Sequence, residues 1–123
     1  MARRDRTILV VDDDEDIRET VRWVLESSGY VVKTAVDGND AWSKLHSNGQ
    51  VSLILLDLMM PGMDGGRFLT LLRNSRHDKV PVVVMSGHHA TPETAQELGA
   101  EGWLVKPVEL DDLLESVCKF AAG

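Results

Sequence analysis

The chain has 123 residues, which is enough for one domain around a single hydrophobic core. With 43% apolar and 27% charged residues, its composition is that of a folded globular protein and argues against disorder. The net charge of −7 disfavours binding to nucleic acid, which requires Lys and Arg to neutralise phosphates, and no apolar stretch is long enough to cross a bilayer.

The N-terminal segment and the single cysteine both indicate a cytoplasmic location. Residues 1–6 are basic, but the apolar run after them is too short for a secretory signal and no small-residue cleavage site follows it. Cys118 cannot form an internal disulfide and is compatible with a reducing compartment. Because Leu114 lies one helical turn before it, we expect Cys118 to be a packing residue.

The first third of the chain predicts a strand, a helix and a second strand. Residues 8–11 are a short apolar run, and the following helical pattern has a plausible stop at Gly29. Residues 30–36 form a weaker apolar run interrupted by Lys33 and Thr34, which suits a strand at the edge of a sheet. The apolar positions of the helix are Ile17, Val21, Val24 and Leu25.

The middle of the chain repeats this alternation. Asp37 is a candidate N-cap for a second helix that ends near Gly49, and residues 51–56 are a continuous apolar run typical of a strand buried on both faces. A third helix is predicted to begin around Asp64. The second helix carries Ala41, Trp42 and Leu45 on its apolar side, and the third carries Phe68, Leu69 and Leu72.

Two further strands and two further helices complete the pattern. Residues 80–85 and 103–105 are apolar runs, and between them Thr91 and Pro92 predict the start of a fourth helix that stops at Gly99. The last helical pattern carries Leu110, Leu113, Leu114, Val117 and Phe120.

Five alternations of strand and helix predict an α/β fold with one doubly wound, five-stranded parallel sheet and helices on both faces. Right-handed crossovers favour the flavodoxin-like strand order 2-1-3-4-5. In that order the chain changes direction between strands 1 and 3, and ligands bind at this point, outside the carboxyl ends of the strands.

Polar residues follow the strands at this edge. Asp12 and Asp13 follow the first strand, Asp57 the third, Ser86 the fourth and Lys106 the fifth. Carboxylates held this close repel one another unless a cation lies among them, and oxygen ligands favour Mg²⁺, with Mn²⁺ as an alternative. The hydroxyl of Ser86 and the charge of Lys106 would complement a transferring phosphoryl group.

A simpler interpretation exists for the acidic run at residues 12–16, which resembles a solvated helix start. It does not explain Asp57, because an isolated carboxylate at the end of a strongly apolar strand is costly without a partner.

At these positions the sequence resembles the receiver domain of two-component response regulators, over residues 7–120. The resemblance lies in ILVVDD at residues 8–13, LLDLMMPGMDG at 55–65, MSG at 85–87 and GAEGWLVKP at 99–107. It divides the chain into an N-terminal tail, residues 1–6, and a receiver domain, residues 7–121, with no output domain in this chain.

The resemblance implies a role for each residue. Asp57 would be the phosphoacceptor for a sensor histidine kinase or a histidine phosphotransfer protein, and Ser86 and Lys106 would bind phosphoryl oxygens. The implied Mg²⁺ ligands are Asp12, Asp13, Asp57 and the backbone carbonyl of Met59. The resemblance also implies a cis peptide bond between Lys106 and Pro107.

The resemblance further implies a conformational switch. Phosphorylation would draw Ser86 towards the phosphoryl group, and Trp103, at the family's aromatic switch position, would change rotamer. The face formed by the fourth helix, fifth strand and fifth helix would then bind a downstream protein or a second copy of the chain. The expected activity is self-phosphorylation and slow autodephosphorylation at Asp57 rather than enzymatic turnover of a separate substrate.

Three alternatives stay open at this point. The chain is a stand-alone regulator or a receiver fragment of a longer response regulator or hybrid kinase. A phosphohydrolase of the haloacid dehalogenase type also places an Asp after a strand, but it needs a second Asp where this chain has Met59. The third alternative is a docking module that is never phosphorylated.

Overall fold

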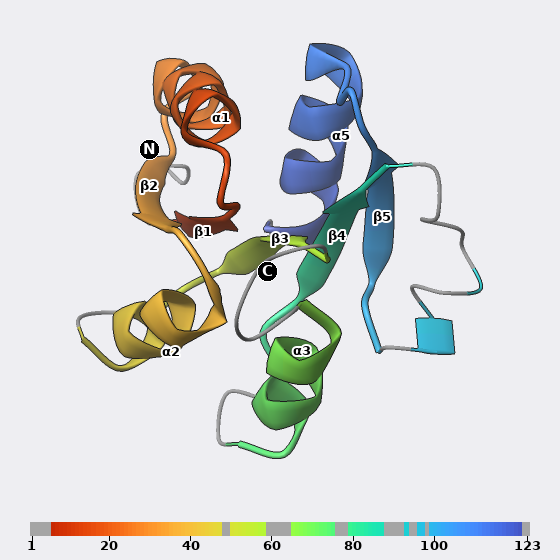
Figure 1. Ribbon diagram of the computed structural model, residues 1–123. Coiled ribbons are helices and arrows are strands. Elements are labelled where there is room, and N and C mark those ends of the chain that lie inside the picture. The colour runs from red at the N-terminus through yellow and green to blue at the C-terminus, as the bar shows by residue number, and fades with distance from the viewer. Residues whose placement is uncertain are drawn as a thin grey trace.

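Five parallel strands form one sheet in the computed structural model of the chain (Figure 1). The strands are β1 (Thr7–Val11), β2 (Val31–Ala35), β3 (Leu53–Asp57), β4 (Val82–Ser86) and β5 (Gly102–Val105). Their order, β2-β1-β3-β4-β5, confirms the order predicted from the sequence. The structure describes residues 6–47, 50–58, 65–75, 79–87, 93, 96–97 and 99–121.

The helices in this part of the chain are α1 (Glu15–Ser27), α2 (Gly38–Ser47), α3 (Gly65–Arg73) and α5 (Leu110–Phe120). Of the fourth predicted helix, only residues 93, 96 and 97 are described, and they are helical. Its predicted start, Thr91 and Pro92, lies outside the described residues.

Helices cover both faces of the sheet, as predicted. Figure 1 shows α1 and α5 on one face and α2 and α3 on the other. Successive side chains of a strand point to opposite faces, so each strand contributes to both cores. One core joins Val21 and Val117 to strand residues such as Val10, and the other joins Leu45 and Phe68 to the opposite side of the sheet.

Aspartates at the starts of two helices satisfy backbone N–H groups that have no partner within the helix. The Asp14 carboxylate accepts hydrogen bonds from the N–H groups of Asp16 at 2.9 Å and Ile17 at 3.2 Å. Asp37 accepts a bond from the Asp40 N–H at 2.8 Å, which agrees with its predicted capping role.

The predicted strands 3 and 4 begin two residues too early. Val51 is buried but precedes the ladder, which starts at Leu53, and β4 starts at Val82 rather than at residue 80. Burial therefore extends into the connecting segments, where apolar side chains cover the core without strand pairing. The prediction for Cys118 is wrong, because its side chain is exposed on the flank of α5.

Candidate functional site

The parallel registers bring the polar strand ends together. Val11, the last residue of β1, pairs with Leu56 of β3. The residues that follow them, Asp12 and Asp57, therefore also lie side by side. Asp57 pairs with Met85, which places Ser86 one step further along β4. Ser86 in turn pairs with Val105 of β5, and the next residue is Lys106. The backbone N–H of Lys106 donates a 2.7 Å hydrogen bond to the Ser86 carbonyl.

Three carboxylates form a compact cluster at this edge of the sheet. One oxygen from each of Asp12, Asp13 and Asp57 lies within 4.8 Å of the other two. Asp12 is fully buried and Asp57 is 3% exposed, whereas Asp13 is exposed to solvent. Asp13 is therefore the member of the cluster that solvent reaches.

The loop that carries the first two acids is held by its own hydrogen bonds. The Asp14 N–H donates to Asp12 Oδ1 at 2.9 Å, and Arg18 Nη1 of α1 donates to the Asp12 carbonyl at 2.8 Å. The Asp12 N–H in turn donates to the Ala35 carbonyl at 3.1 Å. Asp12 is thus held from three directions, and its second carboxylate oxygen is directed towards Lys106.

Lys106 bridges the two buried carboxylates. Its Nζ lies 2.8 Å from Asp12 Oδ2 and 3.5 Å from Asp57 Oδ2. Burial of the ammonium group lowers the pKa of Lys106, but the hydrogen bond to Asp12 and the charges of Asp12 and Asp57 outweigh this effect. The pKa of Lys106 is therefore raised above its usual value, and the group is a cation at neutral pH.

Ser86 ends β4, and Trp103 lies on the neighbouring strand β5, where it pairs with Val84. Ser86 is 3% exposed at the end of β4, so its hydroxyl is close to the edge that Asp57 occupies. Trp103 lies three residues before Lys106 on β5 and is 41% exposed. The peptide bond between Lys106 and Pro107 is cis.

The donor set fits Mg²⁺. Magnesium prefers oxygen ligands, uses one or two carboxylates directly and keeps water in its remaining positions. The cluster offers three carboxylates, and the exposed side at Asp13 leaves room for water and an incoming group. One ammonium group facing the two buried acids leaves negative charge uncompensated, which a divalent cation would balance.

Most of the residues predicted to form the site do meet at this edge. Met59 lies outside the described residues, so its proposed carbonyl ligand stays a prediction. The contact of Arg18 with the Asp12 carbonyl was not anticipated. The only sequence signal for it is a basic residue one turn into a helix that follows an acidic loop.

Among the helices of the described residues, none combines the length and apolar composition of a bilayer span.

Residues 8–118 match the family described as response regulator receiver domain. The chain is 39% identical over 109 residues to the response regulator MprA of Mycobacterium sp. strain KMS, covering 87% of this chain and 46% of that protein. It is 35% identical over 120 residues to the CAI-1 autoinducer sensor kinase/phosphatase CqsS of Vibrio cholerae, covering 94% of this chain and 17% of that protein. The chain thus spans less than half the length of these curated relatives.

Solved structures share the fold over nearly the whole chain. The chemotaxis protein CheY4 of Vibrio cholerae is 33% identical with a TM-score of 0.84, covering 94% of this chain and 98% of that one. A response regulator receiver protein from Pseudomonas putida is 32% identical with a TM-score of 0.86, covering 93% and 96%.

Proposed function

This chain belongs to the response regulator receiver domain family, and on that premise we propose that Asp57 accepts a phosphoryl group from the phosphohistidine of a sensor kinase or a phosphotransfer protein. Receiver domains act in general as phosphoryl-accepting signalling switches. The observation that carries the assignment to Asp57 is the buried position of its carboxylate between two other acids and Lys106.

The proposed step is a transfer between two protein side chains. An oxygen of the Asp57 carboxylate attacks phosphorus, a new P–O bond forms, and the P–N bond to the donor imidazole breaks. The product is an acyl phosphate on Asp57, and the imidazole keeps the electron pair of the broken bond and leaves. Asp57 is suited to attack because β3 and the surrounding core fix its position at the sheet edge.

Charges around Asp57 support the transfer. Lys106 Nζ is 3.5 Å from Asp57 Oδ2 and would pair with an oxygen of the arriving phosphoryl group. The Ser86 hydroxyl, at the end of the neighbouring strand, would donate a hydrogen bond to another oxygen. A bound Mg²⁺, held by Asp12, Asp13, Asp57 and the Met59 carbonyl, would neutralise phosphoryl charge. Mn²⁺ has the same oxygen preference and would serve as a substitute.

Phosphorylation would bias a conformational equilibrium. Ser86 and Trp103 lie on adjacent strands, and Val84 of β4 pairs with Trp103 of β5. A displacement of Ser86 would therefore move the part of β4 that neighbours Trp103, a partly exposed residue whose rotamer we expect to change. By linkage, a partner that prefers the switched state would also favour phosphorylation.

The role of the chain within a larger system is also part of the proposal. We assign residues 7–121 to the receiver domain and residues 1–6 to a tail. The chain covers only 46% of the response regulator MprA and 17% of the sensor kinase/phosphatase CqsS. We therefore propose that this chain functions either as a regulator by itself or as the receiver portion of a longer protein.

Labelling with a small phosphoryl donor tests the assignment. Acetyl phosphate with MgCl₂ should phosphorylate the wild-type protein, and Asp57→Asn should lose the label. The matched control Asp16→Asn removes an exposed carboxylate at the start of α1 and should label like the wild type. Base-labile label that persists in Asp57→Asn contradicts the proposal.

A second experiment separates the switch from a docking module that is never phosphorylated. Beryllium fluoride mimics a bound phosphoryl group and should bind in the presence of Mg²⁺. If neither label nor beryllium fluoride binds while the protein is folded, the docking module becomes the better interpretation.

A further inference from the structure

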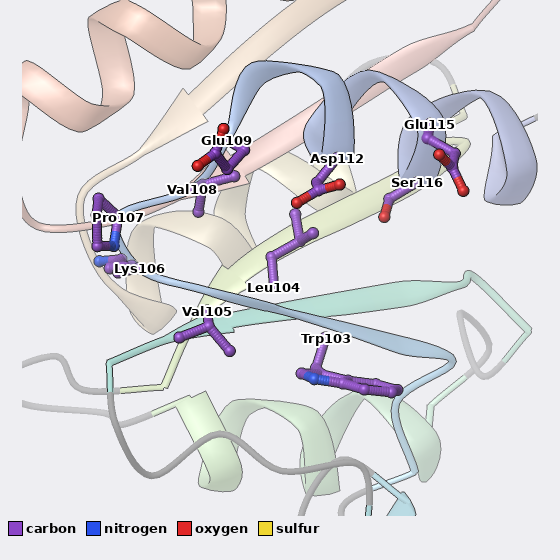
Figure 2. Close-up of a pocket in the computed structure, with 10 residues that line it drawn as sticks. All are labelled: Trp103, Leu104, Val105, Lys106, Pro107, Val108, Glu109, Asp112, Glu115 and Ser116. Atoms are coloured by element: carbon purple, nitrogen blue, oxygen red, sulfur yellow. The ribbon is translucent and has the colours of Figure 1, made fainter.

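Asp12 is held by two cations from different elements of the fold. Figure 2 shows Lys106 beside Pro107, where the chain leaves β5, and its ammonium group pairs with the Asp12 carboxylate at 2.8 Å. The backbone carbonyl of Asp12 accepts a 2.8 Å hydrogen bond from Nη1 of Arg18, in the first turn of α1. Lys106 takes part in the proposed phosphoryl transfer, whereas the bond from Arg18 is made to the peptide group that leads to Asp13.

Arg18 contacts the loop of residues 12–14 through its side chain and through its backbone. The guanidinium donates to the Asp12 carbonyl, and the backbone N–H donates a 3.0 Å hydrogen bond to the Asp14 carbonyl. The Asp14 N–H donates in turn to the Asp12 carboxylate at 2.9 Å. Both peptide groups that flank Asp13 are therefore held, the first by the Arg18 side chain and the second by the Asp12 carboxylate.

The Asp13 carboxylate has no such support of its own. It is exposed, and no residue in the described part of the chain donates a hydrogen bond to it. One of its oxygens nevertheless lies within 4.8 Å of an oxygen of Asp12 and one of Asp57. The direction in which the Asp13 side chain leaves the loop is therefore set by the two peptide groups beside it.

Helix α1 gives Arg18 a fixed position from which to hold the loop. Val21 and Leu25 of this helix are buried in the core that α1 forms with the sheet, and Ile17 packs against the same core. A side chain on a packed helix is placed more precisely than one on a loop. A hydrogen bond from a charged guanidinium is also stronger than one between neutral groups.

Arg18 would affect a bound Mg²⁺ in two opposite ways. Its positive charge repels the ion, but Arg18 is partly exposed, so loss of that charge would strengthen Mg²⁺ binding by no more than about fivefold. Loss of a group that orients a metal ligand typically weakens metal binding by about 10–100-fold. The orienting effect is the larger one, so Mg²⁺ should bind more weakly without Arg18.

We propose that Arg18 is a positioning residue for Asp13 and that it sets the affinity of the acidic cluster for Mg²⁺. Its bond to the Asp12 carbonyl holds the peptide group between Asp12 and Asp13, so the Asp13 carboxylate is directed towards the cluster before an ion arrives. Binding then does not require the loop to become ordered first. The proposal rests on the Mg²⁺ site of the proposed function, but not on phosphoryl transfer to Asp57.

Mg²⁺ titrations of two Arg18 variants test this role. Arg18→Met keeps an unbranched side chain but removes the charge and the donors, and it should raise the Mg²⁺ dissociation constant about tenfold. Arg18→Lys keeps a charge and a donor, and it should stay within about threefold of the wild type. The constants are obtained from the amide shifts of residues 13 and 14 in ¹⁵N-labelled protein, as MgCl₂ is added without a phosphoryl donor.

Arg22→Met is the matched control, because it removes the same charge from the same helix. Arg22 is exposed, and its Nε lies 3.3 Å from Glu26 Oε2 and so makes an ion pair within α1. The Mg²⁺ dissociation constant of this variant should change less than about twofold. Urea unfolding in EDTA shows whether each variant is folded under the conditions of the titration.

The dependence of labelling on MgCl₂ separates positioning from general damage to the fold. With acetyl phosphate as donor, Arg18→Met should need about tenfold more MgCl₂ for half of its maximal labelling rate. At saturating MgCl₂ its rate should recover to within about twofold of the wild type. A side chain that only supported the fold would instead lower the maximal rate.

The outcomes are distinct. Weaker Mg²⁺ binding by Arg18→Met, with recovery in Arg18→Lys, supports the proposal. Binding by Arg18→Met that is as tight as in the wild type or tighter overturns it, and so does equal weakening in Arg22→Met or in Arg18→Lys. Labelling of Asp57 with a Mg²⁺ affinity that does not depend on Arg18 refutes only the positioning role. A Mg²⁺ affinity that depends on Arg18, without any labelling, refutes only the proposed function.

Discussion

Asp13→Asn should stabilise the protein without Mg²⁺ and remove most of its stabilisation by Mg²⁺. The Asp13 oxygen lies within 4.8 Å of one oxygen of Asp12 and one of Asp57. At that separation two unit charges repel by about 1 kcal/mol in water and about 3.5 kcal/mol at an effective dielectric constant of about 20. Because Asp13 is exposed, the value near the water limit applies, about 1 kcal/mol for each neighbour.

Two favourable interactions of the Asp13 charge reduce this repulsion. Lys106 attracts the cluster, and the N-terminus of α1 stabilises nearby negative charge by about 0.3–1 kcal/mol. The net gain in the free energy of unfolding on Asp13→Asn is therefore about 1 kcal/mol. With Mg²⁺ at about ten times its dissociation constant, the wild type gains about 1.4 kcal/mol. The variant, which has lost a ligand, should gain much less, so Mg²⁺ should reverse the order of stability.

Urea unfolding in EDTA and in excess MgCl₂ measures both effects. Glu19→Gln removes a charge from the exposed face of α1 outside the cluster, and its stability should change little under either condition. The reasoning is refuted if Asp13→Asn is less stable than the wild type in EDTA, or if it gains as much from Mg²⁺ as the wild type does.

Two further predictions concern the rest of the fold. Arg73→Ala should lower the free energy of unfolding by about 1–3 kcal/mol in urea titrations, because the Arg73 guanidinium donates hydrogen bonds to the carbonyls of residues 80 and 99. In the control Arg22→Ala, which breaks an exposed ion pair with Glu26, the loss should be less than about 0.5 kcal/mol. Equal losses would contradict this. In a variant with Trp23 and Trp42 replaced by Phe, beryllium fluoride with Mg²⁺ should change the Trp103 fluorescence, and an unchanged spectrum would remove Trp103 from the switch.

The apolar runs of the strands were enough to predict the order of the sheet and the proximity of Asp12 to Asp57. Buried parallel strands have continuous apolar sequences, so the run at residues 8–11 was recognisable, and strand order then placed Asp12 beside Asp57. Side-chain direction was not predictable in the same way. Cys118 is exposed because the buried side of α5 is centred on Leu113 and Val117, one position away from the Leu114 side.

Individual hydrogen bonds and ion pairs between different elements of the fold could not be predicted from the sequence either. The bond from Arg18 to the Asp12 carbonyl depends on how α1 leaves the loop, and the 2.8 Å pair of Lys106 with Asp12 joins residues 94 positions apart. The same holds for Arg73, which pairs with Glu101 and links α3 to the segments before β4 and β5. No periodic pattern encodes such pairs, because they arise only when the sheet has brought the elements together.

Chemical trapping of the acyl phosphate tests the central claim most directly. Borohydride reduces an aspartyl phosphate to homoserine, so brief treatment after phosphorylation, followed by tandem mass spectrometry, identifies the modified residue. Homoserine at position 57, dependent on both donor and Mg²⁺, is the predicted result. Homoserine at Asp12 or Asp13, or an unmodified Asp57 in protein that carries base-labile label, would contradict the account.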